Sequence, residues 1–321
     1  MADRQIEKAY IRVKDGLPTY EASLTVWHGL LQRGIEVEGF TNVEDILPKL
    51  TPETLVHGGV GDARKAVTHL GKPAPDLPTL PPALQPLLGR TVATMTLEEA
   101  RRLPWPFFMK PVEHKLFTGH VVGAFKDHFR TSSLPENALV HVQGVVNFVS
   151  EYRAFIHKDE VIGMKHYAGD FRIPPDVGVA DQAIEALMKR ELLPVAFSVD
   201  LGVLDTGQTV VVEVNDAFAL GNYGLNWPRY LPMVMDRWLE MTGDPVVQML
   251  DQIRRFAQGE TSYRQFANRF IFRCVGDAFE DPCIGQAYLR WCEYTSLRDK
   301  VQQEALRRDI RTVWATFGNR G

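Results

Sequence analysis

The stretch VVVEVNDAFALGNYG, residues 210–224, begins like a buried strand and then departs from that pattern. Its apolar run carries the acid Glu213, then Asn215 and Asp216, before glycines interrupt it. Removing an ionised carboxylate from water costs free energy unless the charge is paired or binds a cation. These acceptors at the end of an apolar strand therefore indicate a functional site.

Residues 195–215 as a whole predict a β-hairpin. We expect its turn at residues 205–208, where residues that tolerate positive φ join two apolar strands. Asp200 lies on the first strand, whereas Glu213 and Asn215 lie two residues apart on the second strand and therefore share a face. Pairing across the turn should bring the three side chains together.

Such a cluster requires a cation, because converging carboxylates repel one another and lose hydration. Ligands that are all oxygen atoms suit Mg²⁺, with Mn²⁺ as an alternative. Magnesium is commonly held by one or two carboxylates, and phosphates of a nucleotide complete its shell. The sequence should therefore supply lysines or arginines that face this cluster from other segments.

Basic residues of this kind occur on or near the strands expected before the hairpin. They are Lys110, Lys115, Arg153 and Lys165. The consensus G-x-x-x-x-G-K-[ST] is absent, because the Gly-Lys pair at 71–72 is followed by proline, and no G-x-G-x-x-G opens a helix. The sequence thus excludes a P-loop and a Rossmann nucleotide site.

The order of the predicted elements indicates an α/β protein in three parts. Residues 1–90 read as an N-terminal β-α-β lobe that ends in a proline-rich connector at 73–86. Residues 91–243 alternate strands and helices and hold the candidate site. Residues 244–321 read as a helical extension that starts at an N-cap candidate, Asp244.

The composition is that of an ordinary globular protein with 321 residues, 45% hydrophobic content and a formal net charge of −4. The sequence contains no apolar run of about 18 residues, and its N-terminus is polar, so we expect a cytoplasmic protein without membrane contact. A pI near 6.2 argues against nucleic acid as the main partner.

Taken together, these residues resemble the ATP-grasp ligases. The signature of that family is a strand lysine, a mobile glycine loop, a second lysine strand, an aspartate strand and a Glu-x-Asn strand. The matching positions are Lys110, the loop at 113–123, Lys165, Asp200, Glu213 and Asn215. The resemblance implies the ATP-grasp fold, in which two α+β subdomains grip ATP, here with the N-terminal lobe and the helical C-terminal extension added.

Four segments resemble more narrowly a bacterial and phage ATP-grasp clade for which peptide or amide ligation has been proposed. They are VHGGVGDARKAVTHLG, KPVEHKLFTG, SEYRAF and VEVNDAFALGNYGL. The resemblance covers about residues 54–240, and the two ends of the chain lie largely outside it.

The resemblance implies how ATP would be bound. Lys110 and Lys165 would bind the α- and β-phosphates, and Lys115 would reach them when the glycine loop closes. Glu151 would accept hydrogen bonds from the ribose hydroxyls. The residues implied to line the adenine are Val142, Gln143 and Val145.

The resemblance also implies metal and transition-state roles. Asp200 and Glu213 would hold one Mg²⁺, and Glu213 would bridge to a second ion completed by Asn215. Many family members carry an arginine two residues before the aspartate, where this chain has Ser198. Arg153 is therefore the candidate that stabilises the transferring γ-phosphoryl group.

The implied activity is an ATP- and Mg²⁺-dependent ligation of a carboxylate to an amine through an acyl phosphate. Expected substrates are a small-molecule or peptide carboxylate and an amine, and a homodimer is left open. The same site could serve a kinase that transfers the γ-phosphate to a hydroxyl. A non-catalytic nucleotide-binding module is the third hypothesis.

Some residues keep a second interpretation. Arg153 could pair structurally with Glu151 or Asp170, rather than face a phosphate. Asp216 and Tyr223 could contact a substrate or belong to a helix-capping turn.

Two further features are interpreted structurally. His57 precedes two glycines, and a lone histidine at a strand end is more often a hydrogen-bonded structural residue than a ligand. Residues 301–317 predict a helix with an apolar face that includes Val301 and should pack on the rest of the protein or on another subunit. Its arginines, Arg307, Arg308 and Arg311, are expected off that face, where they leave an acidic peptide or RNA as an alternative partner.

Overall fold

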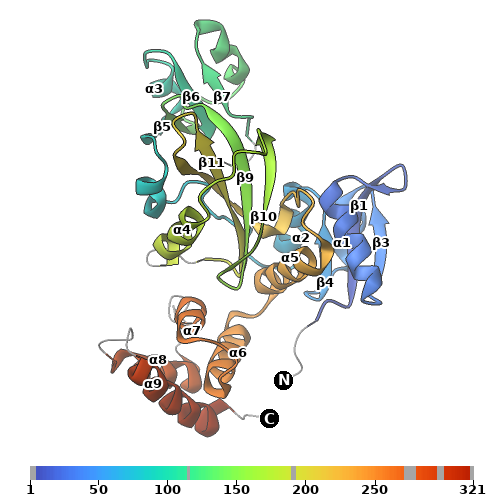
Figure 1. Ribbon diagram of the computed structural model, residues 1–321. Helices are drawn as coiled ribbons and strands as arrows, with labels where there is room; N and C mark the ends of the chain where they lie inside the picture. Colours follow the sequence, from blue (N-terminus) through green and yellow to red (C-terminus); the bar gives the residue numbers. More distant parts are fainter. Residues whose placement is uncertain (1–4, 114–115, 189–192, 271–279, 295–299, 319–321) are drawn as a thin grey trace.

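The computed structural model describes residues 5–113, 116–188, 193–270, 280–294 and 300–318. Three parts are visible in Figure 1: an N-terminal lobe, a pair of four-stranded sheets, and a C-terminal group of helices. The observed fold is the mixed α/β arrangement expected from the sequence.

The N-terminal lobe has the predicted β-α-β arrangement. Its central strands run in the order β3-β1-β4 and are parallel, and the short β2 pairs antiparallel with β1. Its elements are β1 (Lys8–Lys14), β2 (Leu17–Pro18), α1 (Glu21–Gln32), β3 (Glu36–Phe40), β4 (Thr54–His57) and α2 (Val60–His69).

The first sheet of the central part is antiparallel, with the order β5-β8-β6-β7. Its elements are β5 (Val92–Thr96), α3 (Leu97–Ala100), β6 (Phe107–Pro111), β7 (His120–Val122) and β8 (Leu139–Gln143). In this sheet Lys110 lies opposite His141, whereas Val142 lies opposite Met109 and faces the buried core on the reverse side.

The second sheet is also antiparallel and has the order β10-β9-β11-β12. Its elements are β9 (Phe148–His157), β10 (Glu160–Gly169), α4 (Gly178–Met188), β11 (Ala196–Leu204) and β12 (Thr209–Asp216). Strands β11 and β12 form the predicted hairpin, and their turn occupies residues 205–208.

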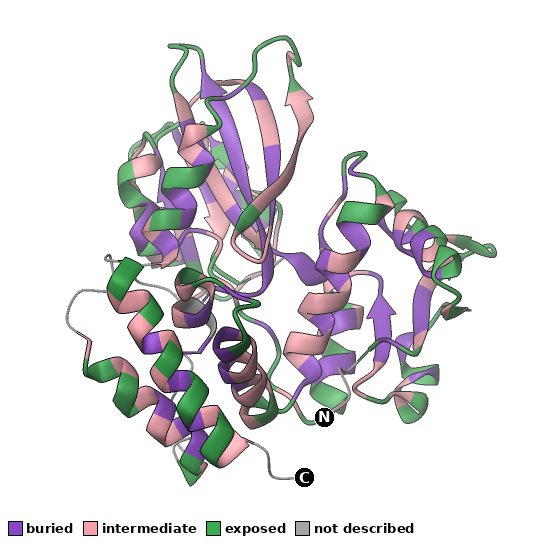
Figure 2. Ribbon diagram, turned by 60° about the horizontal axis from the view of Figure 1, so that its bottom comes forward, coloured by how far each residue is buried: buried purple, intermediate pink, exposed green. Residues whose placement is uncertain are grey.

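The faces of the second sheet pack against different helices. Ala154 and Val199 point to one face and pack with residues of α4, while Phe155 points to the other and joins the core of the N-terminal lobe. That second core also includes α5 (Trp227–Thr242), which lies between the sheet and the N-terminal lobe in Figure 1. Figure 2 shows buried stretches concentrated on the sheets and on the inward sides of helices.

The proline-rich connector is more structured than a simple linker. A 3₁₀ helix covers Pro82–Leu87, and Leu84 is fully buried in the core that also contains α4. The carbonyl of Thr79 accepts a hydrogen bond of 2.8 Å from the N–H of Val214 on β12. The connector therefore covers part of an edge strand, because apolar residues between its prolines can pack on the sheet.

The C-terminal part consists of α6 (Pro245–Gln258), α7 (Tyr263–Arg269), α8 (Pro282–Cys292) and α9 (Lys300–Val313), followed by a π-helical turn at Trp314–Gly318. Asp244 caps α6 as predicted, because its Oδ1 accepts hydrogen bonds from the N–H groups of Val246 and Val247 at 2.8 and 3.2 Å. These helices share a core of their own.

Helix α9 differs from its sequence-based interpretation in which residues face inward. Val301 is 74% exposed. The guanidinium of Arg307 lies 4.8 Å from the ring centre of Phe256, and Arg311 Nε donates to the carbonyl of Ala257 at 2.9 Å. Two of the three arginines thus pack on α6, because a long side chain can lay its stem along apolar surface.

No described helix is long and apolar enough to cross a membrane. The boundaries near residues 90 and 243 stay predictions.

Candidate active site

Four charged residues lie in one row across the second sheet. Residues that face each other directly in antiparallel strands point to the same side of the sheet. From β10 to β12, the residues in register are Lys165, Arg153, Asp200 and Glu213. The row therefore places two cations beside two anions on the face that is turned away from α4.

The central contact of the row is a buried pair between Arg153 and Asp200. Arg153 Nε donates to Oδ1 of Asp200 at 2.8 Å, and Nη2 donates to Oδ2 at 2.7 Å. The side chains are only 9% and 2% exposed. Such a fork-like contact fixes the plane of the guanidinium as well as its position.

Glu213 connects the row to the first sheet. Lys110 Nζ lies 2.9 Å from Glu213 Oε2, and the Nδ2 of Asn215 donates to Glu213 Oε1 at 3.1 Å. The same Nδ2 lies 3.4 Å from Asp200 Oδ2. The three acceptor residues predicted from the hairpin are thus brought together, and Lys110 faces them from the opposite sheet.

Burial and neighbouring charges act against each other in this cluster. Burial raises the pKa of Asp200, Arg153 opposes that effect, and the carboxylates of Glu213 and Glu151 add to it, so that the pKa stays above its ordinary value. Burial would also raise the pKa of Glu213, but Lys110 outweighs it and the pKa is lowered. Asp200 is therefore a carboxylate whose negative charge is incompletely compensated.

The donor set fits a divalent cation. Asp200, Glu213 and Asn215 supply two carboxylates and an amide oxygen, if the Asn215 side chain rotates to present its oxygen. Within the described ranges there is no cluster of three His, Cys, Asp or Glu side chains suited to a metal. These residues could hold Mg²⁺ only if phosphates and water completed its shell.

Two tyrosines enclose Arg153 from the side of β10. Tyr167 and Tyr223 stack with their ring centres 5.0 Å apart and their planes at 21°. The Arg153 guanidinium lies 4.9 Å from the Tyr223 ring centre and 6.0 Å from that of Tyr167. Tyr167 also donates its hydroxyl to Glu151 Oε2 at 2.9 Å. The aromatic pair thus links the arginine to the residue expected to bind ribose.

Arg90 joins the two sheets at the hinge between them, and the sequence reasoning did not find it. It donates to the side-chain oxygen of Gln143 and to the carbonyls of Val211 and Val212 on β12, the latter two at 2.8 and 2.9 Å. Burial lowers its pKa, and the charge of Glu213 opposes this effect. An arginine after a glycine in a connector carries no local signal, because its partners lie more than 50 residues away.

The structure places the other predicted residues as follows. Gln143 is buried at the hinge, Val145 is 47% exposed just after β8, and Val142 can present only its backbone to a ligand on the Lys110 face. Glu151 lies on the site face of β9, beside Tyr167. Lys115 lies outside the described residues.

The structural pairings proposed for Arg153 in the sequence are not observed. Arg153 is bound by Asp200, which belongs to the neighbouring strand, whereas Asp170 binds Arg172 at 2.8 Å. Glu151 and Arg153 share a face of β9, but the acceptor directly across the strand pair outcompetes a neighbour along the strand.

Two residues near the site have structural environments. His57 is buried, and its Nδ1 lies 3.0 Å from Ser23 Oγ. Burial lowers its pKa to about 4, so that its ring is neutral at pH 7. Asp216 binds Arg237 through both carboxylate oxygens, at 2.7 and 2.6 Å, and accepts a hydrogen bond of 3.4 Å from the N–H of Phe218. It thus belongs to a helix-capping turn.

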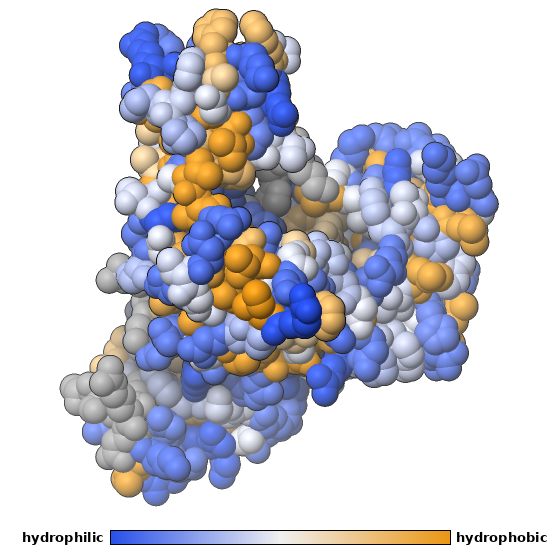
Figure 3. Space-filling model, turned by 45° about the horizontal axis from the view of Figure 1, so that its top comes forward, coloured by the Kyte–Doolittle hydropathy of each residue, from blue (hydrophilic) through white to orange (hydrophobic). Residues whose placement is uncertain are grey.

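A hollow separates the N-terminal lobe from the paired sheets on the face seen in Figure 3. The charged row lies on the sheet face whose far end packs against that lobe through Phe155. The site is therefore bounded by two sheets and by the N-terminal lobe.

Solved structures share this arrangement at low sequence identity. A D-alanine–D-alanine ligase from Bacillus anthracis complexed with ATP is 13% identical, with a TM-score of 0.43, over 73% of this chain and 97% of that one. A RimK-domain ATP-grasp protein from Sphaerobacter thermophilus is 15% identical, with a TM-score of 0.46, over 72% and 97%. The ATP-grasp ligase PsnB with a minimal precursor is 16% identical, with a TM-score of 0.43, over 74% and 99%. Similarities this distant assign no role to any residue.

The comparison with curated proteins gives no significant match. By contrast, residues 87–233 match a family described as an ATP-grasp domain, the second family of its clade. This segment begins in the connector, contains both sheets and ends within α5. The family match, on the segment that builds the charged row between two facing sheets, places this protein in the ATP-grasp superfamily.

Proposed function

We propose that this protein is an ATP- and Mg²⁺-dependent ligase that joins a carboxylate to an amine. The observation that carries the proposal is the row of Lys165, Arg153, Asp200 and Glu213 across four strands. It combines cations for phosphates with carboxylates for a divalent ion, and phosphoryl transfer requires both.

The cations would bind the triphosphate. Among the described residues Lys165 has no acidic partner, and Lys110 is paired with Glu213 across the gap between the sheets. Binding of ATP would draw Lys110 from the carboxylate to a phosphate, because the carboxylate would then bind the metal. Gln143, held by Arg90, would fix the backbone of the hinge beside the adenine.

The acids would hold Mg²⁺ through Asp200, Glu213 and Asn215. When bound, the metal would neutralise charge on the phosphate oxygens. Arg153 lies between Lys165 and Asp200 in the row, so its guanidinium would face the transferring phosphoryl group. The tyrosine pair would hold that guanidinium in place.

The chemistry would proceed in two displacements. An oxygen of the substrate carboxylate attacks the γ-phosphorus, and the bond to the bridging oxygen of ADP breaks. The amine then attacks the carbonyl carbon of the acyl phosphate, inorganic phosphate leaves with the electrons of the C–O bond, and the amine loses a proton. No protein nucleophile takes part; the protein supplies alignment and exclusion of water.

Phosphate release from ATP tests this function directly. Pairs of carboxylates and amines are supplied with Mg²⁺, and the Glu213→Ala variant serves as the blank. Asp205→Ala is the matched control, because Asp205 lies in the exposed turn of the same hairpin. We expect phosphate release only when both substrates are present, with the control active and the blank inactive.

Two outcomes would support the other hypotheses. A phosphorylated product formed without any amine would indicate a kinase. ATP binding without turnover on any substrate pair, unchanged in Asp200→Ala, would indicate a nucleotide-binding module.

A further inference from the structure

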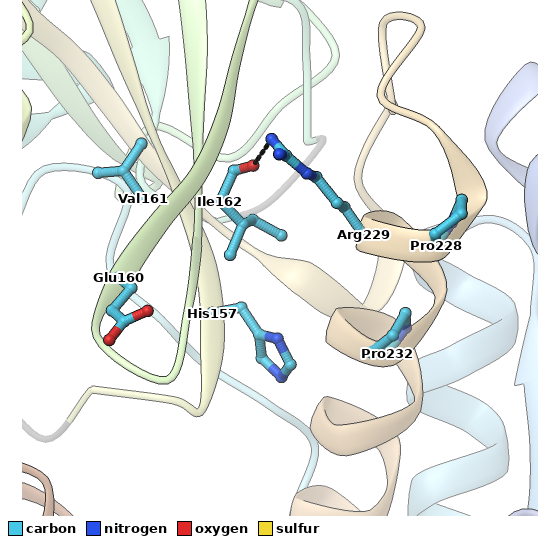
Figure 4. Close-up of a pocket in the computed structure, with 7 residues that line it drawn as sticks. All are labelled: His157, Glu160, Val161, Ile162, Pro228, Arg229 and Pro232. Atoms are coloured by element: carbon cyan, nitrogen blue, oxygen red, sulfur yellow. Dashed lines mark hydrogen bonds between the residues drawn. The ribbon is translucent and has the colours of Figure 1, made fainter.

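A surface pocket of about 360 Å³ lies between the β9–β10 hairpin and the first turns of α5. Figure 4 shows the hairpin on one side and the helix with Pro228, Arg229 and Pro232 on the other. Its volume suits a small molecule. The pocket lies beyond the four-residue row, and no role proposed above for ATP or Mg²⁺ uses it.

Arg229 reaches across this pocket from α5 toward β10 (Figure 4). Its Nη1 donates to the carbonyl of Ile162 at 2.7 Å. Within the described part of the chain, its other guanidinium N–H groups have no protein acceptor. The arginine is therefore fixed in position by one bond, while most of its donors are available to an anion.

The strand register relates Arg229 to the charged row. A β-carbon built on Gly163 would lie 4.0 Å from Arg229 Nη1. Gly163 and Lys165 pair with Phe155 and Arg153, so both point to the site face. Two residues along a strand span about 7 Å. Arg229 thus lies beside the phosphate-binding row on the same face of the sheet.

A second charge in the pocket is uncompensated. Glu160, at the start of β10, is exposed and has no basic partner among the described residues. His157 is already bound, because its Nε2 lies 2.8 Å from Asp236 Oδ2, and Lys158 Nζ contacts the same oxygen at 2.7 Å. The pocket therefore presents one available cation and one available anion.

We propose that this pocket binds the carboxylate substrate as an amino acid zwitterion. Arg229 binds the carboxylate on the side of the charged row, and Glu160 accepts the ammonium group at the far end. The carboxylate must approach the γ-phosphate, which is also negative, so a cation beside its path lowers the repulsion between them. The substrate role rests on the ligase function proposed above, whereas zwitterion binding does not.

Saturation-transfer NMR without ATP tests the binding itself. The probes are the twenty proteinogenic L-amino acids, their C-terminal amides and their N-acetyl derivatives. We expect at least one free amino acid to bind about 10-fold more tightly than its amide and its N-acetyl form, because each derivative loses one charge-assisted contact. The proposal is overturned if no amino acid binds, or if the free acids and amides bind equally.

Variants separate binding from a structural role of Arg229. Arg229→Gln should abolish the preference for acid over amide, and Arg229→Lys should restore part of it. Glu160→Gln should abolish the preference for the free amine. Arg290→Gln, an exposed arginine on α8, should change neither preference. If Arg229→Gln only lowers the unfolding midpoint and leaves the acid-to-amide ratio intact, Arg229 merely fastens the Ile162 carbonyl and the proposal is wrong.

The two proposals fail separately. Zwitterion binding that depends on Arg229, without any ATP-dependent ligation, would leave the pocket and remove the ligase function. Ligation of substrates with no acid preference at this pocket would do the reverse.

Discussion

Two arginine–aspartate pairs are buried in this protein with nearly the same geometry. Arg153 and Asp200 form two hydrogen bonds of 2.8 and 2.7 Å, while Arg237 and Asp216 form two of 2.7 and 2.6 Å. Both pairs have side chains that are at most 11% exposed. The two pairs differ in what surrounds them.

The surroundings of the Arg237 pair are closed. Arg237 Nη1 also bonds Glu240 Oε2 at 2.8 Å, and that oxygen accepts a hydrogen bond of 2.8 Å from the N–H of Val195. These contacts tie α5 to the strands on either side of the hairpin. Because each charged group has a protein partner, the pair has a structural role.

The surroundings of the Arg153 pair leave charge uncompensated. The remaining Nη1 of Arg153 has only a 3.4 Å contact with the Gly221 carbonyl and the faces of two tyrosines. Asp200 faces a second carboxylate, that of Glu213, in the next strand. Geometry alone therefore does not distinguish a structural pair from a functional one; neighbouring like charges do.

The largest effect should come from Arg153→Gln. If Arg153 stabilises the transferring phosphoryl group, the rate of ATP-dependent phosphate release should fall by about 10³–10⁵-fold. Single-turnover phosphate release measures the loss, and circular dichroism checks the fold. Arg172→Gln, which removes an exposed arginine paired with Asp170, is the control. A loss smaller than about 10-fold would mean that Arg153 does not act in phosphoryl transfer.

The Arg237 pair should instead determine stability. Arg237→Gln leaves Asp216 and Glu240 buried without their cation, so the free energy of unfolding should fall by about 3–5 kcal/mol. Urea denaturation measures this change. The exposed pair Arg290–Glu293 provides the control, since Arg290→Gln should cost at most about 1 kcal/mol. Equal losses in the two variants would contradict the structural role.

His57 extends the comparison to a buried group that has no opposite charge. Its pKa is lowered to about 4 by burial, from an ordinary value near 6.5. Between these values the unfolded chain binds a proton that the folded protein does not, so stability is complete above pH 6.5 and decreases as the pH falls toward 4. The loss should reach about 3 kcal/mol.

Denaturant unfolding at several pH values measures this effect. His57→Asn should remove the His57 contribution to the pH dependence. His69→Asn, at an exposed position of α2, should leave it unchanged. A wild-type curve that coincides with that of His57→Asn over this range would refute the prediction.

Metal and nucleotide should stabilise the protein through Asp200. With Mg²⁺ and a non-hydrolysable ATP analogue at 100 times the dissociation constant, stability should rise by about 2.7 kcal/mol. The thermal unfolding midpoint reports this increase, and a chelator should reverse it. Asp200→Asn should abolish the effect, whereas Asp205→Asn should preserve it. A full shift in Asp200→Asn would exclude Asp200 as a metal ligand.

The smallest effect should come from the aromatic contact that only the Arg153 pair possesses. Tyr223→Leu removes a ring from the face of the guanidinium, and such contacts contribute about 1 kcal/mol. We expect about a 5-fold decrease in the rate of phosphate release. Tyr167→Phe keeps both rings and is the control for Tyr223. A rate unchanged in Tyr223→Leu would show that Asp200 alone positions Arg153.

The sequence by itself determined the strands and the acceptors on them. An alternation of period two, a turn rich in residues tolerant of positive φ, and acids in an apolar run are local signals. They predicted that Asp200, Glu213 and Asn215 would meet, and the strand register bears this out. The family resemblance added the order of the lysine strands.

Only the tertiary structure decided which charges are partners. Arg153 binds an aspartate 47 residues away, Lys110 binds Glu213 from another sheet, and Arg90 reaches β12 from the connector. Each of these contacts depends on the packing of segments distant in sequence, which a local pattern does not specify. The sequence therefore decides which groups each strand carries, and the packing of sheets and helices decides which of them remain available for a ligand.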